Sequence, residues 1–196
     1  MTAASLPTPS VRPGDGERAE LFEIIAERSF RRGLFKLSSG IESNLYFNLK
    51  PAMMHPRGAY LSARSFLDIL HREGADYVGG LEMGAVPILG AVAAIGEIEG
   101  RPVRTFFVRK QPKAHGTRDL VEGLGPNETL AGRKVVVADD VATSGASIYR
   151  AIETARAAGA LVEAALVLVN REEGAEAFLA EHGVRLLAVY RASQFA

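Results

Sequence analysis

The sequence predicts an α/β fold, a mostly parallel, doubly wound sheet flanked by helices, with a small N-terminal lobe beside it. Three observations lead to this prediction. From residue 77 onward, short apolar segments alternate with amphipathic ones, as strands alternate with crossover helices. The apolar segments are almost wholly Val, Leu and Ala, which is typical of parallel strands buried on both faces. Before residue 77 the pattern is different, with two helices on either side of a hairpin.

The N-terminal segments come first. Residues 1–16 are rich in Pro, Ser, Thr and Gly, and we expect a flexible tail that precedes one domain over 17–196. Residues 17–32 carry apolar side chains at helical spacing, and Gly33 is expected to end this helix. Ser38-Ser39-Gly40 separates two short apolar stretches and predicts a hairpin. A second helix is expected over 57–72.

The rest of the chain predicts a sheet with helices between its strands. The expected strands are 77–80, 103–108, 134–139, 161–169 and 184–190. The expected helices are 85–95, 145–158 and 173–182. A long loop containing Gly and Pro follows the strand 103–108. We find no internal repeat and no second domain.

Composition excludes several classes of function. The 196 residues are 47% hydrophobic and 23% charged, which is ordinary for one buried domain. A net charge of zero argues against nucleic acid or a membrane as partner through bulk electrostatics. The absence of cysteine excludes disulfides, thiol nucleophiles and thiolate zinc sites, and the four histidines have no ligand-like spacing. With no secretory signal and no membrane-length apolar run, we expect a cytoplasmic protein.

The most informative segment is VVVADDVATSGAS, residues 135–147. A buried strand delivers Asp139 and Asp140 to its carboxyl end, where ligands bind in open α/β sheets. The turn that follows offers free N–H groups and hydroxyls to a phosphate, while two adjacent carboxylates can accept hydrogen bonds from a vicinal diol. Phosphate and diol together describe ribose 5-phosphate. The alternative, a helix-capping turn, does not explain why a buried strand should end in two like charges.

A second segment, residues 101–118, is basic and contains no acid. Its cations are Arg101, Arg104, Arg109, Lys110, Lys113 and Arg118. A charge run is usually a solvated face. Here the charges pass from the end of a strand into a loop with few apolar anchors, so we interpret the loop as a lid for an anionic ligand.

Both segments resemble a known family. Residues 135–147 resemble the phosphoribosyl pyrophosphate (PRPP) signature of the type I phosphoribosyltransferases, and Arg109-Lys110-x-x-Lys113-x-His115-Gly116 resembles the loop of the orotate enzymes among them. The resemblance extends over about residues 20–192. It implies the type I phosphoribosyltransferase fold, with a hood formed by about 17–50 and the C-terminal end. It also implies transfer of the phosphoribosyl group to orotate in pyrimidine biosynthesis, which gives orotidine 5′-phosphate and pyrophosphate.

The resemblance also implies roles for individual residues. The implied catalytic residues are Lys113, Asp139 and Asp140. The residues implied to bind PRPP and its pyrophosphate are Gly84, Arg109, Lys110, Lys113, His115, Asp139, Asp140, Val141, Ala142, Thr143, Ser144, Gly145, Ala146 and Ser147. Those implied to bind orotate are Ser38, Tyr46, Phe47, Thr143 and Arg171. Mg²⁺ would arrive with PRPP, with no direct protein ligand and water bridges to the acid pair. A homodimer with shared active sites is implied as well.

Some of these assignments have alternatives. Tyr46 and Phe47 would also suit a hydrophobic core or the hairpin, and Arg171 would also suit a solvent-exposed strand end. Many family members have lysine at the positions of Ser38 and Gly84, so carboxylate recognition here would depend more on backbone N–H groups. Two other functions stay open: a phosphoribosyltransferase for another base, and a non-catalytic regulator that senses PRPP.

Overall fold

The computed structural model describes residues 14–36, 42–111 and 120–196, and a six-stranded sheet lies at its centre. The strands run in the order β5-β4-β3-β6-β7-β8 across the sheet. Their bounds are β3 Tyr77–Leu81, β4 Arg104–Val108, β5 Val121–Glu122, β6 Lys134–Ala142, β7 Leu161–Asn170 and β8 Arg185–Arg191. All neighbours pair in parallel except β5, which is antiparallel to β4. The predicted mostly parallel sheet is therefore confirmed.

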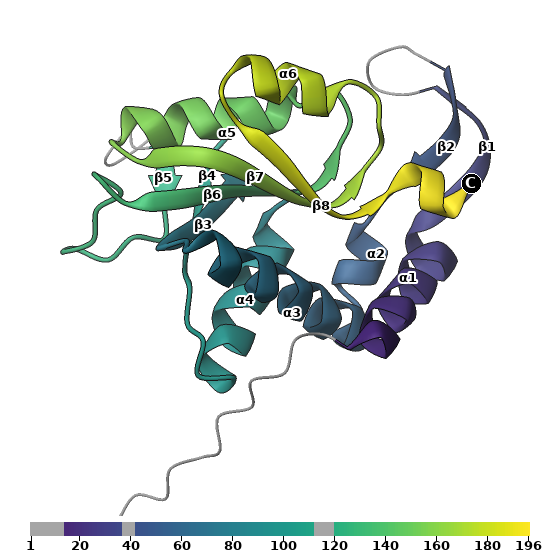
Figure 1. Cartoon of the computed structure of the whole chain (residues 1–196), viewed down its shortest axis with the longest axis horizontal. Coiled ribbons are helices and arrows are strands. Elements are labelled where there is room, and N and C mark those ends of the chain that lie inside the picture. Colours follow the sequence, from purple (N-terminus) through teal and green to yellow (C-terminus); the bar gives the residue numbers. More distant parts are fainter. Residues whose placement is uncertain (1–13, 37–41, 112–119) are drawn as a thin grey trace, which may run out of the picture.

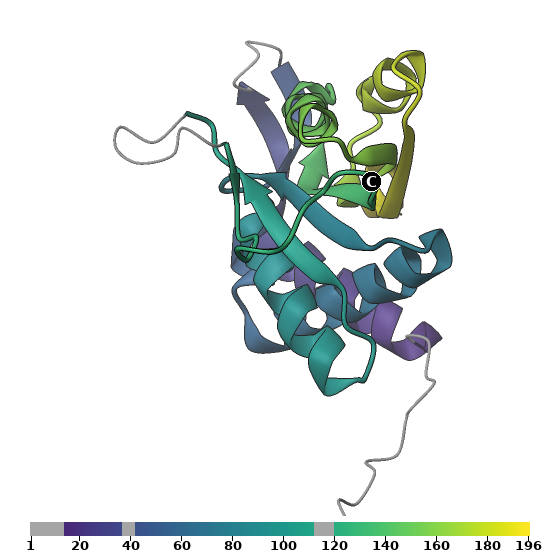
Figure 2. The same ribbon diagram turned by 90° about the vertical axis from the view of Figure 1, so that its left-hand side faces the viewer.

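Helices cover both faces of this sheet. Helices α5 (Ala146–Ala157) and α6 (Ala175–Glu181) lie on one face, and α3 (Pro56–Glu73) and α4 (Val86–Ile98) on the other (Figures 1 and 2). Alternate residues of β6 point into two separate cores: Val135 and Val137 pack toward α5, and Val136 and Ala138 toward α3 and α4. Burial on both faces is the physical reason for the almost wholly apolar strands.

The N-terminal lobe stands at one end of the sheet (Figure 1). It consists of α1 (Asp15–Ser29), β1 (Phe30–Lys36), β2 (Glu42–Phe47) and the short α2 (Lys50–Met53). Strands β1 and β2 pair antiparallel, as the predicted hairpin requires. The C-terminal 3₁₀ turn, Ala192–Phe195, packs against this lobe: the Phe195 ring stacks on Phe22 at 4.2 Å and meets Phe47 edge-on at 5.4 Å.

Some predicted boundaries were wrong. The first helix begins at Asp15 and ends at Ser29, because residues from Phe30 onward pair with β2 and cannot continue the helix. Gly33, with φ of 148°, therefore lies inside β1 at a register irregularity and is not a helix stop. Strand β6 continues to Ala142, three residues beyond its predicted end, because β7 runs alongside it that far. The short α2, β5 and 3₁₀ turn were not predicted.

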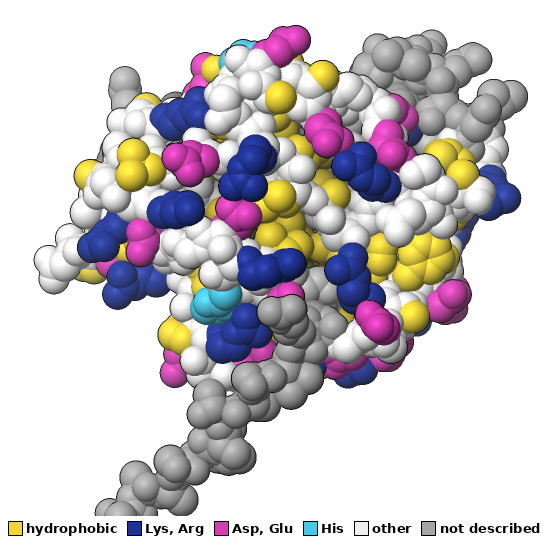
Figure 3. All heavy atoms as spheres, viewed as in Figure 1, with side chains coloured by type: hydrophobic (Ala, Val, Ile, Leu, Met, Phe, Trp, Pro, Cys, Tyr) yellow, Lys and Arg dark blue, Asp and Glu magenta, His cyan; other side chains and the backbone are white. Residues whose placement is uncertain are grey.

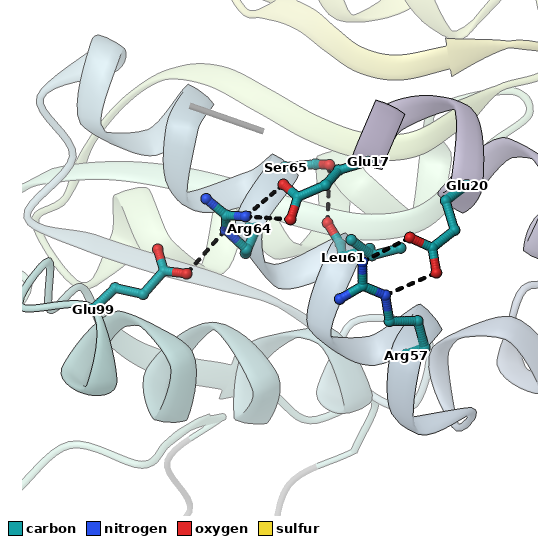
Figure 4. Close-up of polar contacts among 7 residues, drawn as sticks. All are labelled: Glu17, Glu20, Arg57, Leu61, Arg64, Ser65 and Glu99. Carbon is teal, nitrogen blue, oxygen red and sulfur yellow. Dashed lines mark hydrogen bonds and ion pairs between the residues drawn. The ribbon is translucent and has the colours of Figure 1, made fainter. Parts of the chain in front are cut away.

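Ion pairs attach the lobe's first helix to the layer below the sheet (Figure 4). The Arg64 guanidinium of α3 is buried and lies between the carboxylates of Glu17 in α1 and Glu99 at the end of α4, with Arg64 Nε 2.9 Å from Glu99 Oε1. Arg57 meets Glu20 at 2.6 Å on the exposed side. Because a buried guanidinium is costly without a counter-ion, Glu17 and Glu99 fix α1 against α3 and α4.

The surface carries a mixture of charges. In the view of Figure 3, acidic and basic side chains are interspersed over the molecule. In the ranges that the structure covers, no helix combines the length and the apolar character needed to cross a bilayer.

Candidate active site

The acid pair lies in the last four residues of β6. Asp139 is buried, and its two carboxylate oxygens accept hydrogen bonds from the Asp140 amide (2.9 Å) and the Ser147 hydroxyl (3.2 Å). The Asp140 side chain is 14% exposed and accepts a hydrogen bond from the Val141 amide at 3.0 Å. The structure therefore brings both acids to the opening of the β6–α5 connection, as the sequence predicts.

Burial, followed by the charge of Asp140, raises the pKa of Asp139 to about 7. The Asp140 amide and the Ser147 hydroxyl oppose this rise, since they donate to the ionised form. With Asp139 ionised, the side chains of Asp139 and Asp140 carry two adjacent negative charges. A ligand that donates hydrogen bonds to these oxygens would relieve the repulsion.

The free energy of unfolding of Asp139→Asn should rise relative to that of the wild type as pH rises from about 4 to about 7. The raised pKa means that the folded protein keeps the proton that the unfolded chain has lost, so this contribution to stability is complete below the unfolded pKa and is lost as pH rises through about 7. The free energy of unfolding in urea at several pH values measures the difference. Glu153→Gln, which neutralises an exposed acid on α5, is the control. A constant difference between wild type and Asp139→Asn would contradict the prediction.

The turn from Thr143 to Ser147 leads β6 into α5. Gly145 has φ of 86°, and a Cβ there would lie 3.0 Å from the Phe178 ring, so both backbone and space call for glycine. Gly145 brings no capping side chain, and the N–H groups of the first helical turn can therefore face an anion at the positive end of the helix dipole. The predicted phosphate-binding residues thus form one continuous turn beside the acid pair.

Gly84, in the turn between β3 and α4, lies directly against the acids. A Cβ at this position would be 2.3 Å from Asp139 Oδ1 and 2.9 Å from Asp140 Oδ1. Since Asp139 is buried and held by two hydrogen bonds, a side chain at position 84 would displace it. This contact gives a physical reason for glycine where many family members have lysine.

The basic segment divides into two parts. Arg101 and Arg104 form ion pairs with Asp68 (3.8 Å) and Glu128 (3.2 Å). The solvated-face interpretation fits Arg104, whose side chain is 63% exposed, but not Arg101, whose side chain is 23% exposed. Arg109 and Lys110 directly follow β4. The Lys110 amide donates a hydrogen bond to the Glu82 carboxylate at 2.8 Å, and the Lys110 carbonyl accepts one from Arg150 of α5. Lys113 and His115 lie outside the described residues.

Arg171 joins the sheet to the N-terminal lobe, the predicted hood. Its amide donates to Ala142 at the end of β6 (2.9 Å), and its guanidinium donates to the Leu45 carbonyl of β2 (2.9 Å) and to Glu173 (2.7 Å). Only 6% of the side chain is exposed, so the alternative of a solvent-exposed strand end is wrong. Thr143 lies next to Ala142, and Arg171 and Thr143 therefore meet at the same edge of the sheet.

Comparison with known proteins agrees with this arrangement. Residues 57–181 match the family model of the phosphoribosyl transferase domain. The chain is 52% identical to an orotate phosphoribosyltransferase of Bradyrhizobium sp. (strain ORS 278) over 178 residues, which cover 91% of this chain and 96% of that protein. This chain belongs to the orotate phosphoribosyltransferase family.

Solved structures of family members share the fold. The Mycobacterium tuberculosis orotate phosphoribosyltransferase in complex with Fe(III) dicitrate superimposes with a TM-score of 0.78 at 32% identity, over 92% of this chain and 99% of that one. The same enzyme in complex with PRPP gives a TM-score of 0.73 at 26% identity, over 93% of each chain. The fold is therefore the type I phosphoribosyltransferase fold, as the sequence predicts.

The two aromatic residues expected to bind orotate, Tyr46 and Phe47, lie in different surroundings. Phe47 is buried in the core of the hood, 5.0 Å from the Phe30 ring and in edge contact with Phe195. Tyr46 is 39% exposed, because neighbouring residues of a strand point to opposite sides. The core alternative therefore holds for Phe47, and Tyr46 is an exposed aromatic of the β1–β2 hairpin. Ser38 lies outside the described residues.

Three residues near the site were missed by sequence reasoning. Lys50 of α2 lies 3.5 Å from Asp140, Glu82 accepts from Lys110, and Glu173 pairs with Arg171. Glu173 stands two residues from Arg171 in the sequence, and that spacing of opposite charges was the one available signal. The pairings of Lys50 and Glu82 join segments that are distant in the sequence, so no local sequence pattern indicated them.

Proposed function

We propose that the chain transfers the 5-phosphoribosyl group of PRPP to orotate, giving orotidine 5′-phosphate and pyrophosphate in pyrimidine (UMP) biosynthesis. The observation that carries the proposal is the acid pair, with Asp139 buried and Asp140 partly exposed, that leads directly into the glycine turn of α5. In this proposal Asp139 and Asp140 accept hydrogen bonds from the ribose hydroxyls. The N–H groups and hydroxyls from Thr143 to Ser147 hold the 5′-phosphate.

The leaving group is assigned to the turn at Gly84 and to the basic loop. As pyrophosphate departs, positive charge develops on the ribose and negative charge on the leaving oxygen. Lys113, with its neighbours Arg109, Lys110 and His115, stabilises the negative charge, and the acid pair favours the positive one. A direct transfer of this kind needs no covalent enzyme intermediate.

Orotate is assigned to the space between Arg171 and the hood. The contact between Arg171 and the Leu45 carbonyl supports this assignment, because it joins a cation at the edge of the sheet to the strand that carries Tyr46. Arg171 attracts the anionic pyrimidine, Thr143 adds a hydroxyl, and the backbone near Ser38 completes the recognition. Together these groups orient N1 of orotate toward C1′ of the ribose.

Magnesium is proposed to arrive with PRPP. Within the described ranges, no cluster of three or more acids or histidines could hold a metal ion. The carboxylates of Asp139 and Asp140 are the hard oxygen donors that suit Mg²⁺ through bridging water. The ion would supply positive charge to the phosphates. We also propose a cytoplasmic homodimer in which each site uses Lys113 of the partner subunit.

A panel of bases tests the substrate. With PRPP and Mg²⁺, pyrophosphate should be released with orotate and not with adenine, guanine, hypoxanthine or uracil, because Arg171 and the hood serve an anionic pyrimidine. Comparable turnover of a purine would reassign the chain to another base. Binding of PRPP without release of pyrophosphate for any base would favour the regulator instead.

A further inference from the structure

We propose that Glu173 is an internal counter-ion for Arg171, which pairs with the guanidinium while no substrate is bound and gives way to the anionic substrate. The inference rests on the proposed function, since it takes Arg171 as the group that faces orotate. In this inference the Glu173 carboxylate competes with the substrate at the position where the base is proposed to bind.

The contact itself favours this role. Arg171 Nη2 lies 2.7 Å from Glu173 Oε1, and the two side chains are 6% and 34% exposed. A buried guanidinium needs a negative partner, because an unpaired charge away from water is costly. Glu173 meets that need while no substrate is bound. An anionic substrate at Arg171 can meet the same need.

The two partners differ in how easily they can move. Arg171 is fixed, because its amide is bonded to Ala142 and its guanidinium to the Leu45 carbonyl, as well as to Glu173. Glu173 is one-third exposed, so its carboxylate can turn into water at little cost. The exchange therefore moves the acid and leaves the arginine in place.

The backbone around Glu173 is fixed on both sides. The Glu172 amide donates to Asn170 Oδ1 (2.9 Å), and the Glu172 carboxylate accepts from the Ser193 amide (2.8 Å). On the other side, the Ala175 amide donates to the Thr143 carbonyl at 3.1 Å where α6 begins. Rotation of one side chain is therefore sufficient to release Arg171, and no loop has to move.

The exchange has a consequence for binding. A substrate must displace Glu173 before it reaches Arg171. Its apparent affinity is therefore the intrinsic affinity multiplied by the fraction of molecules in which Glu173 is turned away from Arg171. Removing the charge of Glu173 should remove this competition.

Glu173→Gln tests the inference at saturating PRPP. We expect the KM for orotate to fall by roughly tenfold, as expected where the competing contact is about nine-tenths occupied, with kcat changed less than KM. Gln can still accept a hydrogen bond from Arg171, so the turn should keep its structure. Glu173→Ala, which removes that hydrogen bond as well, should lower the KM in the same way.

Glu172→Gln is the matched control, since it removes the same charge from the adjacent residue, whose carboxylate is held by the Ser193 amide instead. It corrects for the general effect of a lost acid on an anionic substrate. A KM for Glu173→Gln that rises, or that equals the KM of Glu172→Gln, would overturn the inference and make Glu173 a structural partner of Arg171. If wild-type protein does not turn over orotate at all, it is the proposed function that fails.

Discussion

Asp139→Asn and Asp140→Asn should each lower kcat/KM by roughly ten- to a thousandfold, the scale of losing one preorganised electrostatic contact. Each carboxylate is proposed to hold a ribose hydroxyl and to favour the positive charge that develops on the ribose. Asn preserves the shape, and at position 139 it can still bond the Asp140 amide and the Ser147 hydroxyl. Steady-state pyrophosphate release, with circular dichroism to confirm folding, measures the effect.

The matched control is Asp76→Asn. Asp76 accepts a hydrogen bond from the Lys134 amide at the opposite end of β6, so this change repeats the chemistry far from the site. It should leave the rate near that of the wild type. Wild-type rates in both acid-pair variants would mean that Asp139 and Asp140 only form a turn.

Lys113→Ala should lower kcat by about a hundred- to a thousandfold and change the KM for PRPP much less. If Lys113 acts mainly on charge that develops as pyrophosphate leaves, its loss affects the transition state more than the bound substrate. Arg104→Ala is the control, because Arg104 is an exposed cation of the same basic segment that pairs with Glu128. A rise in KM with unchanged kcat would make Lys113 a simple binding residue.

The same variant tests the shared site. Mixing Lys113→Ala with an Asp139→Asn/Asp140→Asn double variant should restore activity, because each mixed dimer would contain one site with both defects and one with neither. Subunit exchange is checked first with a tagged pull-down. Exchange without recovered activity would refute sites that use Lys113 of the partner subunit.

The sequence by itself determined the sheet and the turn that is proposed to bind phosphate. Strands that are almost wholly apolar predicted parallel pairing, because β3, β6 and β7 are covered on both faces. The run from Val135 to Ser147 is contiguous, so its strand, acids and turn could be recognised without knowledge of the rest of the fold. A site of this kind can be recognised in the sequence because its residues are neighbours along the chain.

Only the tertiary structure decided what depends on distant segments. It placed Phe47 in the core and left Tyr46 exposed, because the hood packs on Phe195 at the other end of the chain. It also ended the first helix at Ser29, where pairing with β2 takes over from local helical propensity. The approach of Gly84 to the acid pair and of Arg171 to Leu45 joins residues that lie far apart in the sequence. Packing and long-range hydrogen bonds set these contacts, and neither leaves a periodic pattern in the amino-acid sequence.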